Sequence, residues 1–252
     1  MDDQLIQLLL VHGFAQTSAS WQSVLPFLSQ NRPVYAIDLR GHGKTALTRG
    51  MPTIEGVRSD LIAQLDELEW EKAAVWGYSQ GARVALDLAL NLPDRVAALV
   101  LESGTAGIED PDELQARIDR DEELAKRIES NPIEDFVELW ERWPILSGQN
   151  RALVESQRED RLSHDPKALA AALRGIGQAS YEPMWDQLGN LSMPTLLLTG
   201  GRDAKYCAIA ERLLELIPNC EHEEIAGVGH SVHLEQPHAA PRAVEKFLDK
   251  LA

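Results

Sequence analysis

The sequence predicts an α/β protein: a mostly parallel sheet flanked by helices, with a helical lid inserted between two strands. Short apolar runs bounded by turn residues alternate with helical patterns, which indicates parallel strands joined by helical crossovers. The runs are apolar almost throughout, as is typical of strands buried on both faces. From about residue 105 to residue 190 this alternation stops, and three helix-start patterns follow one another.

The length and the net charge of the chain limit its number of domains and its possible partners. The 252 residues suffice for one large domain with an insertion. A formal charge of −16 repels nucleic acid and anionic membrane surfaces, so we expect neither as a partner. An acidic ligand would need a local basic pocket. No apolar run approaches the ~18 residues of a membrane span, and the acidic start "MDDQ" does not fit a signal peptide.

Two cysteines, Cys207 and Cys220, are too few for a disulfide framework or a metal cluster. We therefore expect free thiols, no metal site and a cytoplasmic protein. The sequence leaves the oligomeric state open between a monomer and a weak homo-oligomer.

Six apolar runs are predicted to be strands, and each ends at a turn or a polar cluster. In parallel sheets, ligands bind beyond the carboxyl ends of the strands, so these polar clusters are the candidate site. The predicted strands are 5–11, 33–39, 73–78, 96–103, 194–200 and 220–227.

The insertion is predicted to contain helices at 111–129, 132–142, 150–162 and 166–177. The stretches "EDPDE", "SNPIE" and "HDPKA" each place Asp or Asn at the helix N-cap and Pro at the first helical position. We expect residues 105–190 to form a lid, and residues 1–104 and 191–252 to form the core.

A nucleophilic serine is indicated by "GYSQG", which fits the G-x-S-x-G turn. Ser79 follows the strand 73–78, Asp203 follows 194–200, and His230 follows 220–227. This is the order of serine, acid and histidine in α/β-hydrolase chains. His230 Nε2 would face Ser79, and Asp203 would orient the imidazole.

The oxyanion hole needs two main-chain N–H donors. We expect them from Gln80, directly after the serine, and from Phe14 in "HGF". His12 is interpreted as packing beneath this loop and His42 as a loop residue. His233 is interpreted as a residue of the lid or the pocket rim.

Three arginines are candidates for the cleft. Arg83 lies four residues after Ser79, on the same helical face, although a surface charge is the alternative. Arg117 falls inside an apolar stripe with Asp121, where it would face the cleft or merely pair with Asp121 across one helical turn. Arg161 falls close to the inner side of its helix, with a solvated arginine as the alternative.

Trp140 shares a helical stripe with Ile133, Phe136 and Val137, so pattern alone favours the core of the lid. The apolar stripe on helix 111–129 consists of Leu114, Ile118, Leu124, Ala125 and Ile128.

Taken together, the chain resembles the MenH family, the 2-succinyl-6-hydroxy-2,4-cyclohexadiene-1-carboxylate synthases of menaquinone and phylloquinone biosynthesis, within the α/β-hydrolase superfamily. The matching motifs are "VHGFAQTSASW", "DLRGHGKT", "GYSQGARVAL", "LVLESGTAG", the arginine in "ARIDRDEELAKRI", "NPIEDFVELWERWPIL", "GGRDAKYCAI" and "GVGHSVHLEQP". The serine and histidine segments occur across the superfamily, whereas the arginines and the tryptophan stretch are more specific.

The resemblance implies a lyase that eliminates pyruvate from a small polycarboxylate substrate without a cofactor. It implies a catalytic triad of Ser79, Asp203 and His230 that abstracts a proton. It also implies carboxylate-binding arginines and pocket aromatics. The residues are Arg83, Arg117 and Arg161 for the carboxylates, Tyr78 and Trp140 for the pocket, and Phe14 and Gln80 for the oxyanion hole.

Two other classes of function remain open. The same triad would serve a carboxylesterase or a carbon–carbon bond hydrolase, and a ligand receptor would keep the triad but act through the lid. About ten residues precede "HGF", whereas the usual superfamily sheet begins with two earlier strands. We therefore expect six or seven strands, mostly or wholly parallel, without that antiparallel pair.

Overall fold

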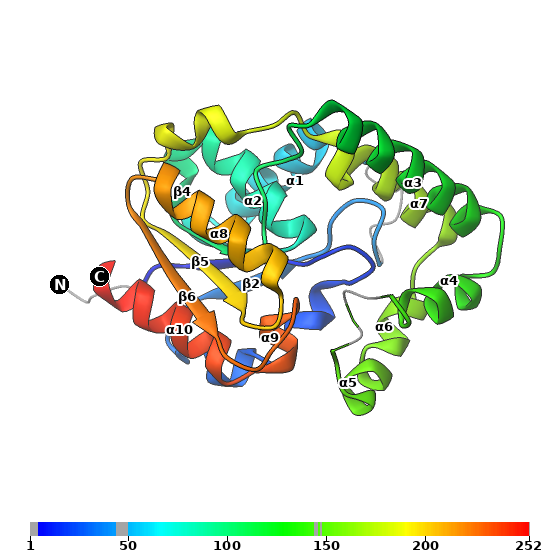
Figure 1. Cartoon of the computed structure of the whole chain (residues 1–252). Helices are drawn as coiled ribbons and strands as arrows, with labels where there is room; N and C mark the ends of the chain where they lie inside the picture. Colours follow the sequence, from blue (N-terminus) through cyan, green and yellow to red (C-terminus); the bar gives the residue numbers. More distant parts are fainter. Residues whose placement is uncertain (1–4, 44–49, 144–145, 147, 252) are drawn as a thin grey trace.

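The computed structural model describes residues 5–43, 50–143, 146 and 148–251. It contains a six-stranded sheet in the order β2-β1-β3-β4-β5-β6, and every pair is parallel (Figure 1). The strands are β1 (Leu8–Val11), β2 (Val34–Ile37), β3 (Ala73–Tyr78), β4 (Val96–Glu102), β5 (Thr195–Gly200) and β6 (Cys220–Ile225).

Each strand lies inside the run predicted for it, so the strand number and direction are confirmed. The described residues ahead of β1 contain no antiparallel strand. Four residues of the matching motifs lie outside the described residues. They are Lys44 and Thr45 of "DLRGHGKT", and Pro144 and Ile145 of "NPIEDFVELWERWPIL".

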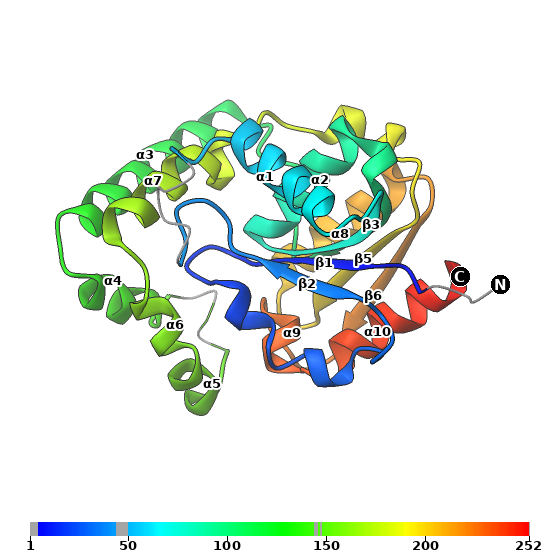
Figure 2. The same ribbon diagram turned by 180° about the vertical axis from the view of Figure 1, so that it is seen from behind.

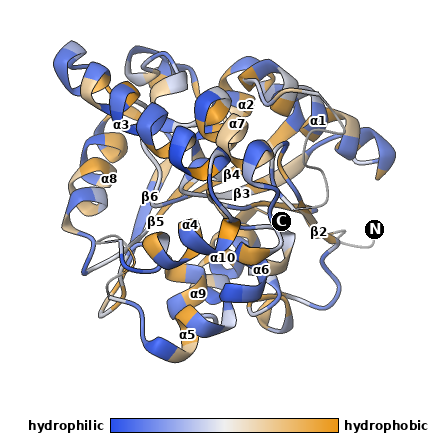
Figure 3. Ribbon diagram, turned by 90° about the vertical axis from the view of Figure 1, so that its right-hand side faces the viewer, coloured by the Kyte–Doolittle hydropathy of each residue, from blue (hydrophilic) through white to orange (hydrophobic). Residues whose placement is uncertain are grey.

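The inner strands β1, β3, β4 and β5 are covered on both faces, which explains why they are apolar almost throughout, whereas the edge strand β6 has the polar sequence CEHEEI and is partly exposed. On β1, Leu9 and Val11 pack on one side with α1 (Ile54–Glu67), α2 (Gln80–Asn91) and α8 (Ala204–Leu216). Leu8 and Leu10 pack on the other side with α10 (Ala239–Leu248) and the 3-10 helix η1 (Ser18–Trp21). Figure 2 shows the two layers from behind, and Figure 3 shows apolar ribbon gathered around the sheet.

The remaining short helices connect these layers. They are η2 (Leu25–Phe27), η3 (Pro93–Arg95), η5 (Gln178–Ser180), η6 (Trp185–Asn190), α9 (Val232–Glu235) and η7 (Asp249–Leu251). Both cysteines are free, as predicted. None of the helices in the described ranges is long and apolar enough to cross a membrane.

A group of helices between β4 and β5 extends beyond the carboxyl ends of the strands (Figure 1). The helices are α3 (Pro111–Glu129), α4 (Ile133–Trp140), α5 (Arg151–Ser156), α6 (Arg158–Leu162) and α7 (Pro166–Ile176). Helices are present in all four predicted ranges. The third range contains two short helices, α5 and α6, separated at Gln157.

Two of the three predicted N-caps are confirmed. Asp110 accepts from the N–H groups of Asp112 and Glu113, and Asp165 accepts from Ala168 N. The Asn131 N-cap is wrong: α4 begins after Pro132 without a side-chain cap. The Asn131 amide instead donates to the Arg127 carbonyl at 2.7 Å, so it satisfies the end of α3.

The stripe predicted for α3 is correct only in the second half of the helix. Leu124, Ala125 and Ile128 are buried, whereas Ile118 is 41% exposed. The first two turns of α3 are mostly exposed, because its neighbours cover the helix only from about Asp121 onward.

Candidate active site

The serine sits on a strained turn between β3 and α2. Ser79 has φ 51° and ψ −102°, a backbone conformation that costs energy and is typical of functional sites. Its N–H donates to the Glu102 carbonyl at 2.9 Å. A Cβ on Gly77 would lie 2.2 Å from Gly81 O, and one on Gly81 would lie 2.1 Å from Val11 O. Both glycines of the motif are therefore required by close backbone packing.

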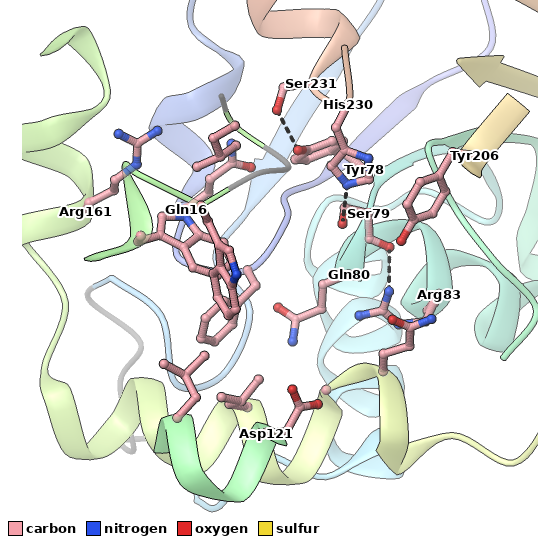
Figure 4. Close-up of a pocket in the computed structure, with 18 of the residues that line it drawn as sticks. Gln16, Tyr78, Ser79, Gln80, Arg83, Asp121, Arg161, Tyr206, His230 and Ser231 are labelled. Atoms are coloured by element: carbon pink, nitrogen blue, oxygen red, sulfur yellow. Dashed lines mark hydrogen bonds between the residues drawn. The ribbon is translucent and has the colours of Figure 1, made fainter. Parts of the chain in front are cut away.

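The three residues predicted as a triad lie together at the carboxyl ends of β3, β5 and β6, and Figure 4 shows Ser79 and His230 side by side. Ser79 Oγ is 3.0 Å from His230 Nε2, and His230 Nδ1 is 2.6 Å from Asp203 Oδ2. A proton on Nδ1, held by the carboxylate, leaves Nε2 free to accept the serine proton. The arrangement has the geometry of a nucleophile or base activated by an oriented histidine.

Phe14 and Gln80, which were expected to supply main-chain N–H donors, both line the cavity. Gln80 N–H belongs to the first turn of α2, where the helix provides no acceptor. Phe14 N–H has no hydrogen-bond partner among the described residues, and Ala15 beside it has φ 57°. His12 lies beneath this loop, as predicted: it is fully buried, and its Nε2 accepts from Leu39 N at 3.0 Å. Burial lowers the pKa of His12, which favours the neutral ring.

Arg83 is not a surface charge, so that alternative is wrong. Its side chain lines the cavity above Ser79, and the residue is only 5% exposed. Nη1 donates to Ser79 O at 3.4 Å, and no carboxylate in the described part of the chain pairs with the guanidinium. Its Nε–H has no partner there at all. Burial lowers the pKa of Arg83, but an arginine keeps its charge at neutral pH.

Arg117 satisfies both interpretations given for it. Nε donates to both carboxylate oxygens of Asp121 at 2.8 Å, and Nη1 donates to Gln178 Oε1. The same side chain lines the cavity. Burial raises the pKa of Asp121, and the neighbouring Arg117 opposes that shift.

The solvated alternative for Arg161 is wrong, because the residue is 3% exposed. Its Nη1 donates to Glu141 Oε1 and to Val154 O, each at 3.2 Å. Arg161 also lines the cavity, on the side of α6. Burial lowers its pKa, while Glu141 opposes that shift.

Aromatic side chains complete the walls. Tyr78 OH lies 2.6 Å from Ser231 Oγ, and burial raises the pKa of this tyrosine. Trp140 both lines the cavity and packs in the apolar cluster of the inserted helices, with its ring 5.4 Å from that of Phe14. Asp121, Gln178 and Tyr206 also line the cavity but were not predicted to do so. Helical periodicity had placed Asp121 on the inner stripe, whereas no pattern marked the other two.

The expectation for His233 is wrong. It is fully buried beneath the triad rather than at the rim, and its ring stacks on Trp21 at 4.3 Å between centroids. Its N–H and Nδ1 lie 3.0 and 2.8 Å from Glu102 Oε1, and Trp76 Nε1 donates to Glu102 Oε2 at 3.0 Å. A buried carboxylate at the end of β4 needs these partners, which pattern alone did not reveal.

Replacing Glu102 by Leu should lower the free energy of unfolding by about 3–5 kcal/mol, because donors of Trp76 and His233 would remain buried without an acceptor. Urea denaturation followed by circular dichroism measures this loss. The exposed Glu109, which pairs with Arg212 on the surface, provides the control: Glu109→Leu should change the midpoint little. Equal midpoints for the two variants would contradict the prediction.

The strained serine after β3, the histidine and acid after later strands, and the parallel sheet define a protein of the α/β-hydrolase class. In agreement, the family model described as alpha/beta hydrolase fold matches residues 7–237, so the chain belongs to that family.

Closer relatives narrow the assignment. A Bacillus subtilis protein that carries the name 2-succinyl-6-hydroxy-2,4-cyclohexadiene-1-carboxylate synthase provisionally is 35% identical over 96% of this chain and 89% of its own length. A Klebsiella pneumoniae protein of that name is 29% identical over 96% and 93%. The solved structure of MenH from S. aureus superposes with a TM-score of 0.93 at 30% identity, covering 99% of this chain and 96% of that one. The chain is a member of the MenH family, and the resemblance is confirmed.

Proposed function

We propose that the chain eliminates pyruvate from 2-succinyl-5-enolpyruvyl-6-hydroxy-3-cyclohexene-1-carboxylate and forms 2-succinyl-6-hydroxy-2,4-cyclohexadiene-1-carboxylate, in menaquinone or phylloquinone biosynthesis. The relatives named above as synthases of this product support the reaction. The observation that carries the proposal is Arg83, a buried cation beside Ser79 that no carboxylate of the described residues neutralises. A neutral ester has no use for such a charge, whereas a polycarboxylate does.

The substrate carries carboxylates on ring carbon 1, on the succinyl group and on the enolpyruvyl group. Arg83, Arg117 and Arg161 line one cavity and would bind them through paired N–H donors. Arg117 and Arg161 already pair with Asp121 and Glu141, so Arg83 contributes the largest uncompensated charge. These cations would offset the repulsion from a chain of charge −16.

The triad would act on the hydrogen of ring carbon 2, which the succinyl carbonyl makes acidic. Ser79 Oγ takes this proton while His230 Nε2 takes the serine proton, and Asp203 stabilises the charged imidazole. Negative charge develops on the succinyl oxygen, where the N–H groups of Phe14 and Gln80 would stabilise it. The electrons then form double bonds at C2–C3 and C4–C5, and the C5–O bond breaks. Pyruvate leaves as its enolate and gains a proton.

We also propose that residues 105–190 act as a lid over a core of residues 1–104 and 191–252. Arg117, Trp140 and Arg161 all come from this segment, so its position decides whether the cavity is complete. The segment is tied to the loop after β1, where Thr17 N donates to Asp160 at 3.0 Å. Such a lid would exclude water from the reaction. A cytoplasmic location is consistent with both cysteines being free.

Incubation of the purified chain with the enolpyruvyl substrate tests the proposal. We expect stoichiometric pyruvate, detected by a coupled lactate dehydrogenase assay, together with the absorbance of the conjugated diene and without any added cofactor. Neutral ester hydrolysis is measured in parallel. Fast ester hydrolysis without pyruvate release would contradict the lyase assignment and would favour a carboxylesterase or a carbon–carbon bond hydrolase.

A further inference from the structure

The side chain of Gln80 lies in the wall of the cavity, directly after Ser79 (Figure 4). The residue is 1% exposed. Its Nε2 donates to the carbonyl of Ile176 at 3.0 Å, at the end of α7. A carbonyl only accepts, so this contact fixes which end of the amide is nitrogen and which is oxygen. The oxygen is therefore directed away from α7.

Gln80 Oε1 has no hydrogen-bond partner among the described residues. Buried acceptors without a donor are rare in folded proteins and are costly when they occur. The neighbouring guanidinium groups do not serve it: Arg83 donates to Ser79 O, and Arg117 donates to Asp121 and Gln178. Gln80, a residue of the cavity wall directly after the reacting serine, thus has a buried, unpaired acceptor that a hydrogen-bond donor of a bound molecule would satisfy.

We propose that Gln80 Oε1 accepts a hydrogen bond from the hydroxyl on ring carbon 6 of the substrate, which makes Gln80 a specificity-determining residue. This inference rests on the proposed function. At neutral pH the carboxylates and the ketone of that substrate only accept hydrogen bonds. The hydroxyl on carbon 6 is its one O–H donor, so it alone matches the unpaired oxygen.

The contact also has a consequence for orientation. Carbon 6 is bonded to carbon 5, which bears the leaving enolpyruvyl group. A hydrogen bond at carbon 6, together with the arginines on the carboxylates, fixes the rotation of the ring within the cavity. An analogue without the hydroxyl would leave Oε1 buried and unpaired, and sites built around a polar contact discriminate against such analogues.

The experiment compares kcat/KM for pyruvate release from the natural substrate and from its 6-deoxy analogue. For the wild type we expect a preference of roughly 5- to 150-fold for the hydroxylated substrate. Gln80→Met, which keeps the length but removes the acceptor, should abolish most of this preference. Gln64 on α1 is also buried and lies outside the cavity, so Gln64→Met should keep the wild-type preference.

One result for the variant would overturn the inference: a Gln80→Met variant that keeps the wild-type preference, whether its activity is unchanged or falls by the same factor on both substrates. The wild type alone decides if the variant does not fold, because equal kcat/KM values for the two substrates would also refute the contact. Failure of the proposed function looks different, since the wild type would then release no pyruvate from either substrate.

Discussion

Ser79→Ala and His230→Ala should each lower kcat for pyruvate release by several orders of magnitude, roughly 10²–10⁴-fold. The 3.0 Å contact between Ser79 Oγ and His230 Nε2 makes the two side chains one proton-transfer unit. Removal of either one interrupts the transfer, so the double variant should be little worse than either single variant.

Steady-state and single-turnover kinetics on the three variants measure this non-additivity. Ser59→Ala, at an exposed serine on α1 whose hydroxyl donates to Glu55 O, should retain wild-type activity. If the losses of the two single variants instead multiply in the double variant, the residues act independently, and the proton relay proposed here is wrong.

Local chemistry made the positions of the triad predictable. Each of Ser79, Asp203 and His230 follows a predicted strand, and parallel strands bring their carboxyl ends to one edge of the sheet. The same reasoning predicts the main-chain donors Phe14 and Gln80, because they depend on short motifs rather than on distant packing, and this remains a prediction.

Features set by tertiary packing were less predictable. His233 lies in a polar stretch close to His230, and nothing local reveals that Glu102, 131 positions earlier, contacts it beneath the triad. Ile118 matches the apolar stripe of α3, yet it is 41% exposed. Asn131 lies between α3 and α4 and could cap either helix. Its side-chain amide donates to the Arg127 carbonyl at the end of α3 and does not cap the start of α4.

The positions of the three arginines could be predicted only in part from the sequence. Helical phase placed Arg83 on the face of Ser79 but did not decide between solvent and cavity. Only the structure shows that Arg83 and Arg161 are buried, and that Arg117 serves both the ion pair and the cavity wall. Whether a long charged side chain is buried depends on elements far away in the sequence. The residue pattern of a single helix therefore does not decide whether its arginine is buried or exposed.

Replacing each cavity arginine by Ala should lower kcat/KM for pyruvate release by roughly tenfold to 150-fold, because loss of one charge-assisted hydrogen bond costs roughly 1.5–3 kcal/mol. Arg83→Ala should lie at the upper end, since no carboxylate in the described residues shares this guanidinium. Arg161→Ala should lie at the lower end, because the paired Glu141 keeps Arg158 as a second partner.

Arg117→Ala has an added effect, since it leaves the Asp121 carboxylate unpaired in the wall that faces an anionic substrate. The matched control is Arg127→Ala, at an exposed arginine on the same helix. Neutral esters lack the carboxylates, so hydrolysis of such an ester should respond little to the three cavity variants, while pyruvate release falls. Pyruvate release that survives all three substitutions would show that these cations do not bind the substrate, and the carboxylate-binding role proposed for the cavity would have to be abandoned.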